Sequence, residues 1–177
     1  MIGRFIRDTR AAAAVEFVLA LPMMLALLFV GLEAGHFFWT EHKLVKAVRD
    51  GARFAARANI EDVCAIGLNG VLTNDLDPGL LSDIQTLTVT GQILNTGQQA
   101  STLPRPKVPG WASTDVVVTP GCGDFVATGI YEDLGSAAAL ITVSSGPVPY
   151  PSILNGLGVL DRTFLIEADA SAAVTGI

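Results

Sequence analysis

The chain of 177 residues is poor in charge and in histidine. Charged residues make up 16% of it, against about 25% in soluble domains, and half of the residues are apolar. Such hydrophobicity excludes an intrinsically disordered chain, and the length leaves room for little more than one domain. The two histidines, His36 and His42, both lie near the N-terminus, so the rest of the chain cannot assemble a Ser-His-Asp triad. Because phosphate-binding glycine loops and His-Glu-x-x-His helices are missing too, we expect neither an enzyme nor a bound cofactor.

Basic residues are scarce after the first third of the chain. Residues 1–58 carry 8 Lys and Arg against 5 Asp and Glu, whereas residues 59–177 carry 3 against 12. The second part therefore has a net charge of −9, which would repel the phosphate backbone of a nucleic acid. We expect no nucleic-acid partner.

One long stretch lacks charge almost entirely. Residues 17–32 contain no charged side chain, and the apolar run of residues 11–39 is interrupted only by Glu16, Glu33 and His36. A helix of about 20 apolar residues is enough to cross the hydrocarbon core of a membrane. The run is longer than the apolar core of an ordinary signal peptide, roughly 7–15 residues, and no clean small-x-small cleavage site follows it. A retained single-span anchor is therefore favoured over a cleaved secretory signal.

The residues that flank this run predict its orientation. Three arginines precede it: Arg4, Arg7 and Arg10. By the positive-inside rule they hold the N-terminus in the cytoplasm, and the aromatic residues 37–39 then fall at the opposite interface. We therefore expect the chain after residue 40 to lie outside the cytoplasm.

Residues 41–58 continue the helix as an amphipathic segment. An apolar stripe recurs at spacings of three and four residues: Leu44, Val48, Gly51 and Ala55. A basic stripe lies on the other side: Lys46, Arg49, Arg53 and Arg57. The basic stripe is either a solvated face or a surface for lipid headgroups or for acidic neighbouring subunits. A helix over residues 12–58 would be about 70 Å long, whereas crossing the bilayer needs only about 30 Å.

The composition changes at Asn59, after which strand-like and turn-rich segments alternate. Four segments are strand candidates: residues 84–94, 115–119, 138–145 and 163–174. In the last of these, six residues share one face: Phe164, Ile166, Ala168, Ala170, Ala172 and Val174. The first four of them should point into the core. Turn-rich pieces lie between them: residues 74–79, 104–110 and 146–151. The predicted fold class is α+β, a long N-terminal transmembrane helix followed by a small antiparallel β-sheet ectodomain.

The chain has only two cysteines, Cys64 and Cys122. An even count in an oxidising compartment predicts a disulfide between them, with two buried free thiols as the alternative. A metal site at this pair has little support, because the chain has no Cys-x-x-Cys and neither histidine lies near it in sequence. The acidic residues 74–79 are typical of a turn, although calcium binding there stays open.

Several separated pieces of the N-terminal third carry a family resemblance. They are Arg-Ala-Ala-Ala-Ala-Val-Glu-Phe at residues 10–17, Leu-Pro at 21–22, Glu-Ala-Gly at 33–35, and Arg-Asp-Gly-Ala-Arg-Phe-Ala-Ala-Arg at 49–57. In this order they resemble the TadE-like family of tight-adherence (Tad/Flp) pilus assembly proteins. The resemblance implies a pseudopilin or minor pilin in the bacterial inner membrane, with its C-terminus in the periplasm. Its partners would be the membrane, a prepilin peptidase and other pilus or pseudopilin subunits.

The same resemblance assigns roles to three residues. The prepilin peptidase would cut between Ala11 and Ala12, where the family typically has glycine in place of Ala11. Glu16 becomes the fifth residue of the mature chain and would serve assembly by meeting the N-terminal amine of a neighbouring subunit. A glutamate at headgroup depth near the positive end of the helix dipole is the alternative for Glu16. The role of Glu33 is ambiguous, because a glutamate at this position could simply lie at the outer interface of the membrane.

These expectations divide the chain into three parts: a cytoplasmic basic leader (residues 1–11), a transmembrane and amphipathic helix (12–58) and a periplasmic α+β domain (59–177). The alternative function is a membrane-tethered periplasmic binding module whose acidic sheet captures a small ligand or a cation. A mere tether needs hydrophobicity, but it gives no reason for a glutamate at residue 16 or for an apolar stripe that continues to Ala55.

Overall fold

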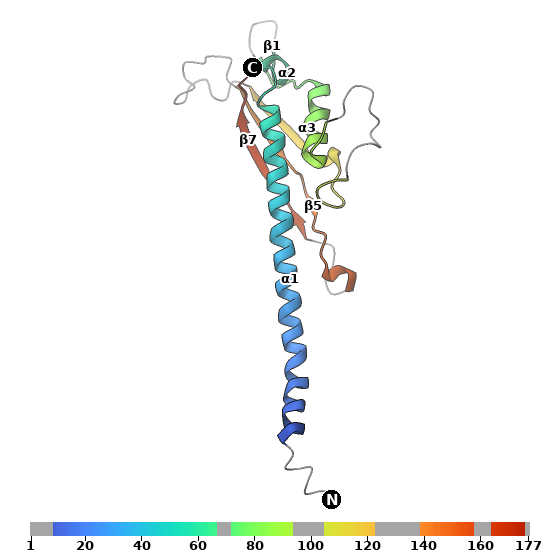
Figure 1. Ribbon diagram of the computed structural model, residues 1–177. Coiled ribbons are helices and arrows are strands. Elements are labelled where there is room, and N and C mark those ends of the chain that lie inside the picture. Colours follow the sequence, from blue (N-terminus) through green and yellow to red (C-terminus); the bar gives the residue numbers. More distant parts are fainter. Residues whose placement is uncertain (1–8, 67–71, 94–104, 123–138, 158–163, 176–177) are drawn as a thin grey trace, which may run out of the picture.

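The computed structural model describes residues 9–66, 72–93, 105–122, 139–157 and 164–175. Helix α1 (Thr9–Ala55) projects far beyond the rest of the molecule, and the other elements gather around its C-terminal half (Figure 1). They are α2 (Ile60–Val63), β1 (Ala65–Ile66), β2 (Leu72–Thr73), α3 (Pro78–Thr90), the 3-10 helix η3 (Ser113–Asp115), β3 (Val117–Cys122), β4 (Ala139–Ser144), β5 (Val148–Pro149), the 3-10 helix η5 (Leu154–Leu157), β6 (Leu165–Ile166) and β7 (Asp169–Ala173). The predicted α+β class, a long helix followed by a small antiparallel sheet, is confirmed.

The main sheet has three antiparallel strands in the order β3-β4-β7. Its central strand β4 lies within the predicted strand 138–145, and β3 overlaps the predicted strand 115–119. Two further pairs are short: β1 with β2, and β5 with β6. Between β5 and β6 the chain forms η5, which lies beside the middle of α1 (Figure 1).

Helices α1 and α3 pack together against one face of the sheet. Along β4, Ala139, Ile141 and Val143 are buried and alternate with partly exposed residues, as expected for a strand with one covered face. Trp111 lies in the same core with 1% of its surface exposed, and its indole Nε1 donates to the carbonyl of Ser145 at 3.1 Å. The polar handle of this large ring is therefore satisfied inside the core.

The segment 84–94 was predicted as a strand, and this prediction is wrong: its residues up to Thr90 belong to helix α3. Asp77 caps the helix by accepting from the backbone N–H of Leu80 at 2.8 Å, and Pro78 follows in the first turn. Gly91 ends the helix in the left-handed conformation, with φ of 86°. Within the helix, the hydroxyl of Thr88 donates to a backbone carbonyl one turn earlier, at 2.6 Å. The helix therefore satisfies the hydroxyls of Thr88 and Thr90, and its caps outweigh the β propensity of its threonines.

The last predicted strand is interrupted, and one of its predicted core residues faces outward. Strand β6 pairs with β5, whereas β7 pairs with β4, so the two strands belong to different sheets. Ile166 has 6% of its surface exposed, as predicted for the core, but Phe164 has 58% exposed. The predicted inward phase is confirmed from Ile166 onward, because Ala168, Ala170, Ala172 and Val174 pack against the core. It fails at Phe164, which precedes β6, in a segment that pairs with β5 outside the main sheet.

Candidate functional site

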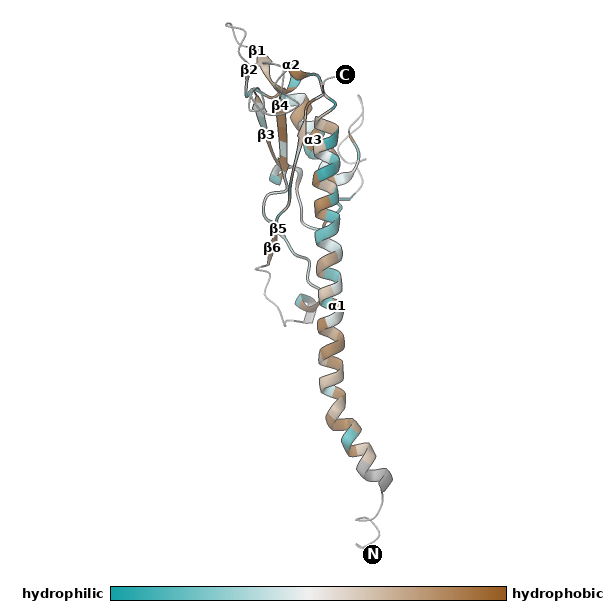
Figure 2. Cartoon of the chain, turned by 90° about the vertical axis from the view of Figure 1, so that its left-hand side faces the viewer, coloured by the Kyte–Doolittle hydropathy of each residue, from teal (hydrophilic) through white to brown (hydrophobic). Residues whose placement is uncertain are grey.

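The N-terminal half of α1 has no cover among the described residues. Every residue from 13 to 32 is exposed, and nearly all are apolar, as the brown colour of this half shows (Figure 2). Over the part of the chain that the structure describes, α1 is the one helix long and apolar enough to cross a membrane. Glu16 lies exposed in this half, and the chain remains helical through Pro22. One candidate span near the N-terminus fits a single-pass membrane protein.

The predicted cleavage residues lie at the very start of this helix. Ala11 and Ala12 have helical backbone within α1. Arg4 and Arg7 lie outside the described residues, as does most of the predicted leader. The structure therefore places the predicted cleavage bond in the first turns of α1, and it brings no described residue to Glu16.

The C-terminal half of α1 is joined to the ectodomain along the predicted apolar stripe. The stripe is buried along its whole length, together with Ala47 and Ala52, and the basic stripe is exposed, as predicted. The closest approach is at Gly51, where an added Cβ would overlap the hydroxyl of Thr88 on α3. Glycine is thus required here because the backbone of α1 lies directly against a fully buried side chain.

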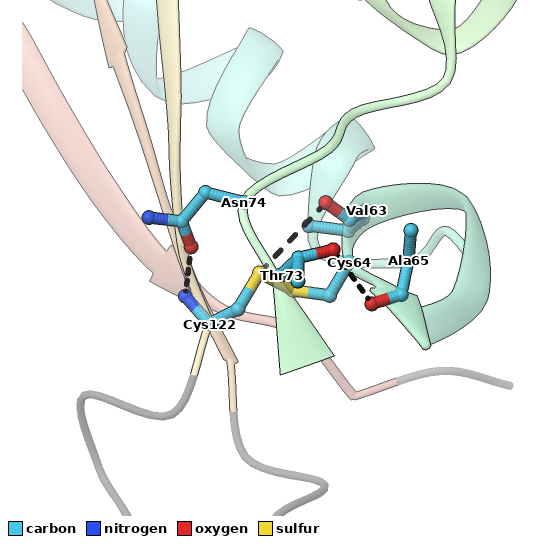
Figure 3. Close-up of a disulfide and its surroundings, with 6 residues drawn as sticks. All are labelled: Val63, Cys64, Ala65, Thr73, Asn74 and Cys122. Carbon is cyan, nitrogen blue, oxygen red and sulfur yellow. Dashed lines mark hydrogen bonds between the residues drawn. A yellow bond between two sulfur atoms is a disulfide. The ribbon is translucent and has the colours of Figure 1, made fainter. Parts of the chain in front are cut away.

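A disulfide connects the chain that follows α1 to the main sheet. Cys64 and Cys122 are bonded, with their Cα atoms 5.9 Å apart, which confirms the predicted pair (Figure 3). Around it, the backbone N–H of Cys122 donates to Asn74 Oδ1 at 2.9 Å, and the hydroxyl of Thr73 donates to the carbonyl of Ala65 at 3.1 Å (Figure 3). The predicted turn at residues 74–79 thus helps to hold the disulfide and starts α3 with Asp77.

Glu33 joins the middle of α1 to the loop that contains η5. Its Oε2 accepts from the backbone N–H groups of Ile153 at 3.1 Å and Leu154 at 3.2 Å. The hydroxyl of Tyr150 donates to the backbone carbonyl of Glu33 at 3.2 Å, and His36 Nδ1 is hydrogen-bonded to the same hydroxyl at 3.0 Å. A carboxylate at the edge of an apolar span is costly, and donors of this kind offset that cost. Glu33 therefore fastens the ectodomain to the helix.

Tyr150 is the ectodomain residue at the centre of this junction. It has 8% of its surface exposed and packs edge-on against Phe37, with ring centroids 5.2 Å apart. Burial, and then the neighbouring Glu33, raises the pKa of the Tyr150 hydroxyl to about 12. The hydroxyl therefore stays protonated and keeps donating at any physiological pH.

An open groove lies between this junction and the apolar half of α1. Its volume is about 490 Å³, and we call it the junction groove. It is lined by Val30, Glu33, Ala34, Phe37, Phe38, Tyr150, Leu154 and Phe164. With the Glu33 carboxylate engaged by the loop, its walls are almost entirely apolar.

Sequence reasoning did not identify Tyr150, the hydrogen-bonding role of Glu33 or the contact between Gly51 and Thr88. The tyrosine between two prolines was a usable signal, since Pro151 disfavours the helical conformation for the residue before it. The partner of Glu33 was not readable, because it lies 120 residues away in the chain.

The described part of the chain holds few residues arranged for acid–base catalysis or for metal binding. No group of three or more His, Cys, Asp or Glu that could hold a metal occurs among the described residues. Of the two histidines, His36 belongs to the junction with Tyr150, and His42 is exposed on α1. The described residues instead form a long helix and the contacts that join it to the ectodomain.

Comparison with protein families finds a match over α1. The model of the TadE-like protein family matches residues 11–53, about a quarter of the chain, and this match coincides with nearly the whole of α1. No curated protein and no solved structure matches the chain. The resemblance seen in the residue pattern is thereby confirmed, and residues 11–53 of this chain are a TadE-like segment.

Proposed function

We propose that this protein is a pseudopilin-like (minor pilin) component of a Tad/Flp-type pilus assembly system. The observation that carries the proposal is that the TadE-like segment coincides with α1, half of which exposes apolar side chains and finds no cover among the described residues. Such a half-helix needs a membrane before assembly and neighbouring helices afterwards. The C-terminal half of α1 is packed into the ectodomain, so the whole helix and the ectodomain must move together.

The proposal divides the chain as the sequence predicts. Residues 1–11 form a cytoplasmic basic leader, residues 12–58 the transmembrane and amphipathic helix, and residues 59–177 the periplasmic domain. The protein is anchored in the inner membrane by one span with its N-terminus in the cytoplasm. The arginines of the leader hold it there, because moving such charges through hydrocarbon is expensive.

Processing would change this balance. A prepilin peptidase cuts between Ala11 and Ala12 and removes the leader with its three arginines. The new N-terminal amine then lies about one helical turn from Glu16. In an assembly, Glu16 pairs with the amine of a neighbouring subunit, so that each group offsets the cost of desolvating the other.

The mass of the protein from cells with and without the peptidase tests the processing step. We expect loss of residues 1–11 only when the peptidase is present, and Ala11→Gly should preserve or improve the cleavage. Glu16→Gln should leave membrane insertion intact and impair pilus assembly. Glu41→Gln is the matched control, because Glu41 is an exposed glutamate of the same helix beyond the apolar run. An intact Met1, with assembly indifferent to Glu16→Gln, would leave the membrane-tethered periplasmic binding module as the better explanation.

A further inference from the structure

The junction groove lies at a depth that the length of α1 defines. The 23 residues that separate Glu16 from Trp39 correspond to about 35 Å of helix, slightly more than the hydrocarbon core of about 30 Å. The α1 wall of the groove runs from Val30 to Phe38, so it occupies the last part of this distance. With α1 in a membrane, this wall lies in the leaflet on the ectodomain side.

The headgroup level is marked just above the groove. Lys43 Nζ lies 3.5 Å from the ring centroid of Trp39, and 56% of the Trp39 surface is exposed. Tryptophan is enriched at membrane interfaces, and a lysine keeps its ammonium in the headgroup region while its stem lies along apolar surface. The groove, which ends at Phe38, therefore lies on the hydrocarbon side of this pair.

The ectodomain reaches the same depth with apolar side chains. Ile153 is 55% exposed, and Phe164 and Leu165 are each 58% exposed. Residues 150–157 contain no charged side chain. Figure 1 shows η5, in orange-brown, beside the middle of α1, and the bonds from Glu33 fix it there. These side chains would be poorly placed in water, but they suit an apolar phase.

Several backbone N–H groups of this loop are hydrogen-bonded within the protein, as an apolar phase requires. The N–H of Tyr150 donates to the carbonyl of Phe164 at 2.8 Å, and the N–H of Ser152 donates to the carbonyl of Tyr150 at 2.9 Å. The next two N–H groups, of Ile153 and Leu154, donate to Glu33. Non-helical backbone enters a membrane only when its polar groups are satisfied within the protein. The Glu33 carboxylate supplies that condition for Ile153 and Leu154, through Oε2 alone.

We propose that the junction groove holds a lipid acyl chain and that η5 with its flanking residues is immersed in the leaflet on the ectodomain side. The ectodomain is then attached to the membrane twice, by α1 and by this loop. The inference rests on the membrane insertion of α1 proposed above and does not depend on pilus assembly.

Tryptophan quenching in vesicles tests this depth. The full chain with Trp39→Phe keeps only the buried Trp111 as background, and a single reporter is then added by Ile153→Trp or, as a second variant, Phe164→Trp. The vesicles are phosphatidylcholine with bromine on the acyl chains. Both reporters should lose most of their emission relative to unbrominated vesicles.

Two control reporters make the result interpretable. Leu27→Trp, in the apolar half of α1, must be quenched by brominated chains if α1 is inserted. Val117→Trp replaces a side chain 55% exposed, like Ile153, but on β3 of the main sheet, and it should be quenched by aqueous iodide instead. Without quenching at residue 27, the proposed insertion itself fails. With residue 27 quenched, reporters at 153 and 164 that respond only to iodide would show a groove open to water. Reporters shielded from both quenchers would show a groove covered by protein, and either result overturns the inference.

Discussion

Replacing Gly51 by alanine tests whether α1 and the ectodomain form one rigid unit. On an ordinary helix the change would gain about 1 kcal/mol of stability, because alanine has the higher helix propensity. At this position the new Cβ would overlap the Thr88 hydroxyl, and the Cβ of Thr88 would lie 3.2 Å away. Thr88 is fully buried and already bonded to the carbonyl of Ile84, so it has little room to move.

The expected magnitude follows from these opposing effects. Overpacking of a filled core costs about 1–3 kcal/mol, and the helix-propensity gain offsets about 1 kcal/mol of it. We expect Gly51→Ala to lower the free energy of unfolding by up to about 2 kcal/mol, worth roughly 2–4 °C in Tm for each kcal/mol at this chain length. Gly35→Ala is the matched control on the same helix, because an added Cβ there meets nothing within 4 Å. It should leave the stability unchanged or raise it.

Thermal unfolding of the full chain in detergent, followed by the fluorescence of buried Trp111, measures the difference. Thr88→Ala removes the overlapping hydroxyl, so in the double variant Gly51→Ala should cost less than it does alone, which a double-mutant cycle detects as coupling. If Gly51→Ala stabilised the protein as much as Gly35→Ala does, the close contact between α1 and α3 would be refuted.

Three further predictions concern the ectodomain and its attachment. Thiol labelling of the denatured, unreduced protein should find neither Cys64 nor Cys122, and replacing both by alanine should cost about 4 kcal/mol of stability; quantitative labelling would contradict the disulfide. Glu33→Ala should leave two backbone N–H groups of the junction loop unpaired, at about 1–3 kcal/mol each, and speed their hydrogen exchange, whereas Glu33→Gln keeps an acceptor and should change exchange much less. Ile166→Asp should strongly destabilise the fold because it buries an unpaired charge, while Val117→Asp, at a 55% exposed position of β3, should affect folding little; equal effects on Tm would show that Ile166 does not lie in the core.

Much of α1 was predictable because its determinants are local. A charge-free run, flanking arginines and a repeat of three and four residues are properties of neighbouring positions along one helix. The structure accordingly reproduces both the buried apolar stripe and the exposed basic stripe. The segment 84–94 shows the limit of propensity. Its β-branched residues predicted a strand, although Asp77, Pro78 and Gly91 carried helix-boundary signals that should have weighed more.

The sequence by itself determined the features that depend on local pattern. These are an apolar helix suited to a membrane, its amphipathic continuation, two cysteines suited to pairing, and the inward phase of β7. Only the tertiary structure decided where distant segments meet. The sequence left Glu33 ambiguous, and the fold brings the backbone of Ile153 and Leu154 to it. Phe164 follows the apolar alternation of its segment, yet it faces outward because the last strand divides between two sheets. Such outcomes depend on contacts between segments that are far apart in the chain, 120 residues for Glu33 and Ile153, and no local pattern encodes which of them will lie together.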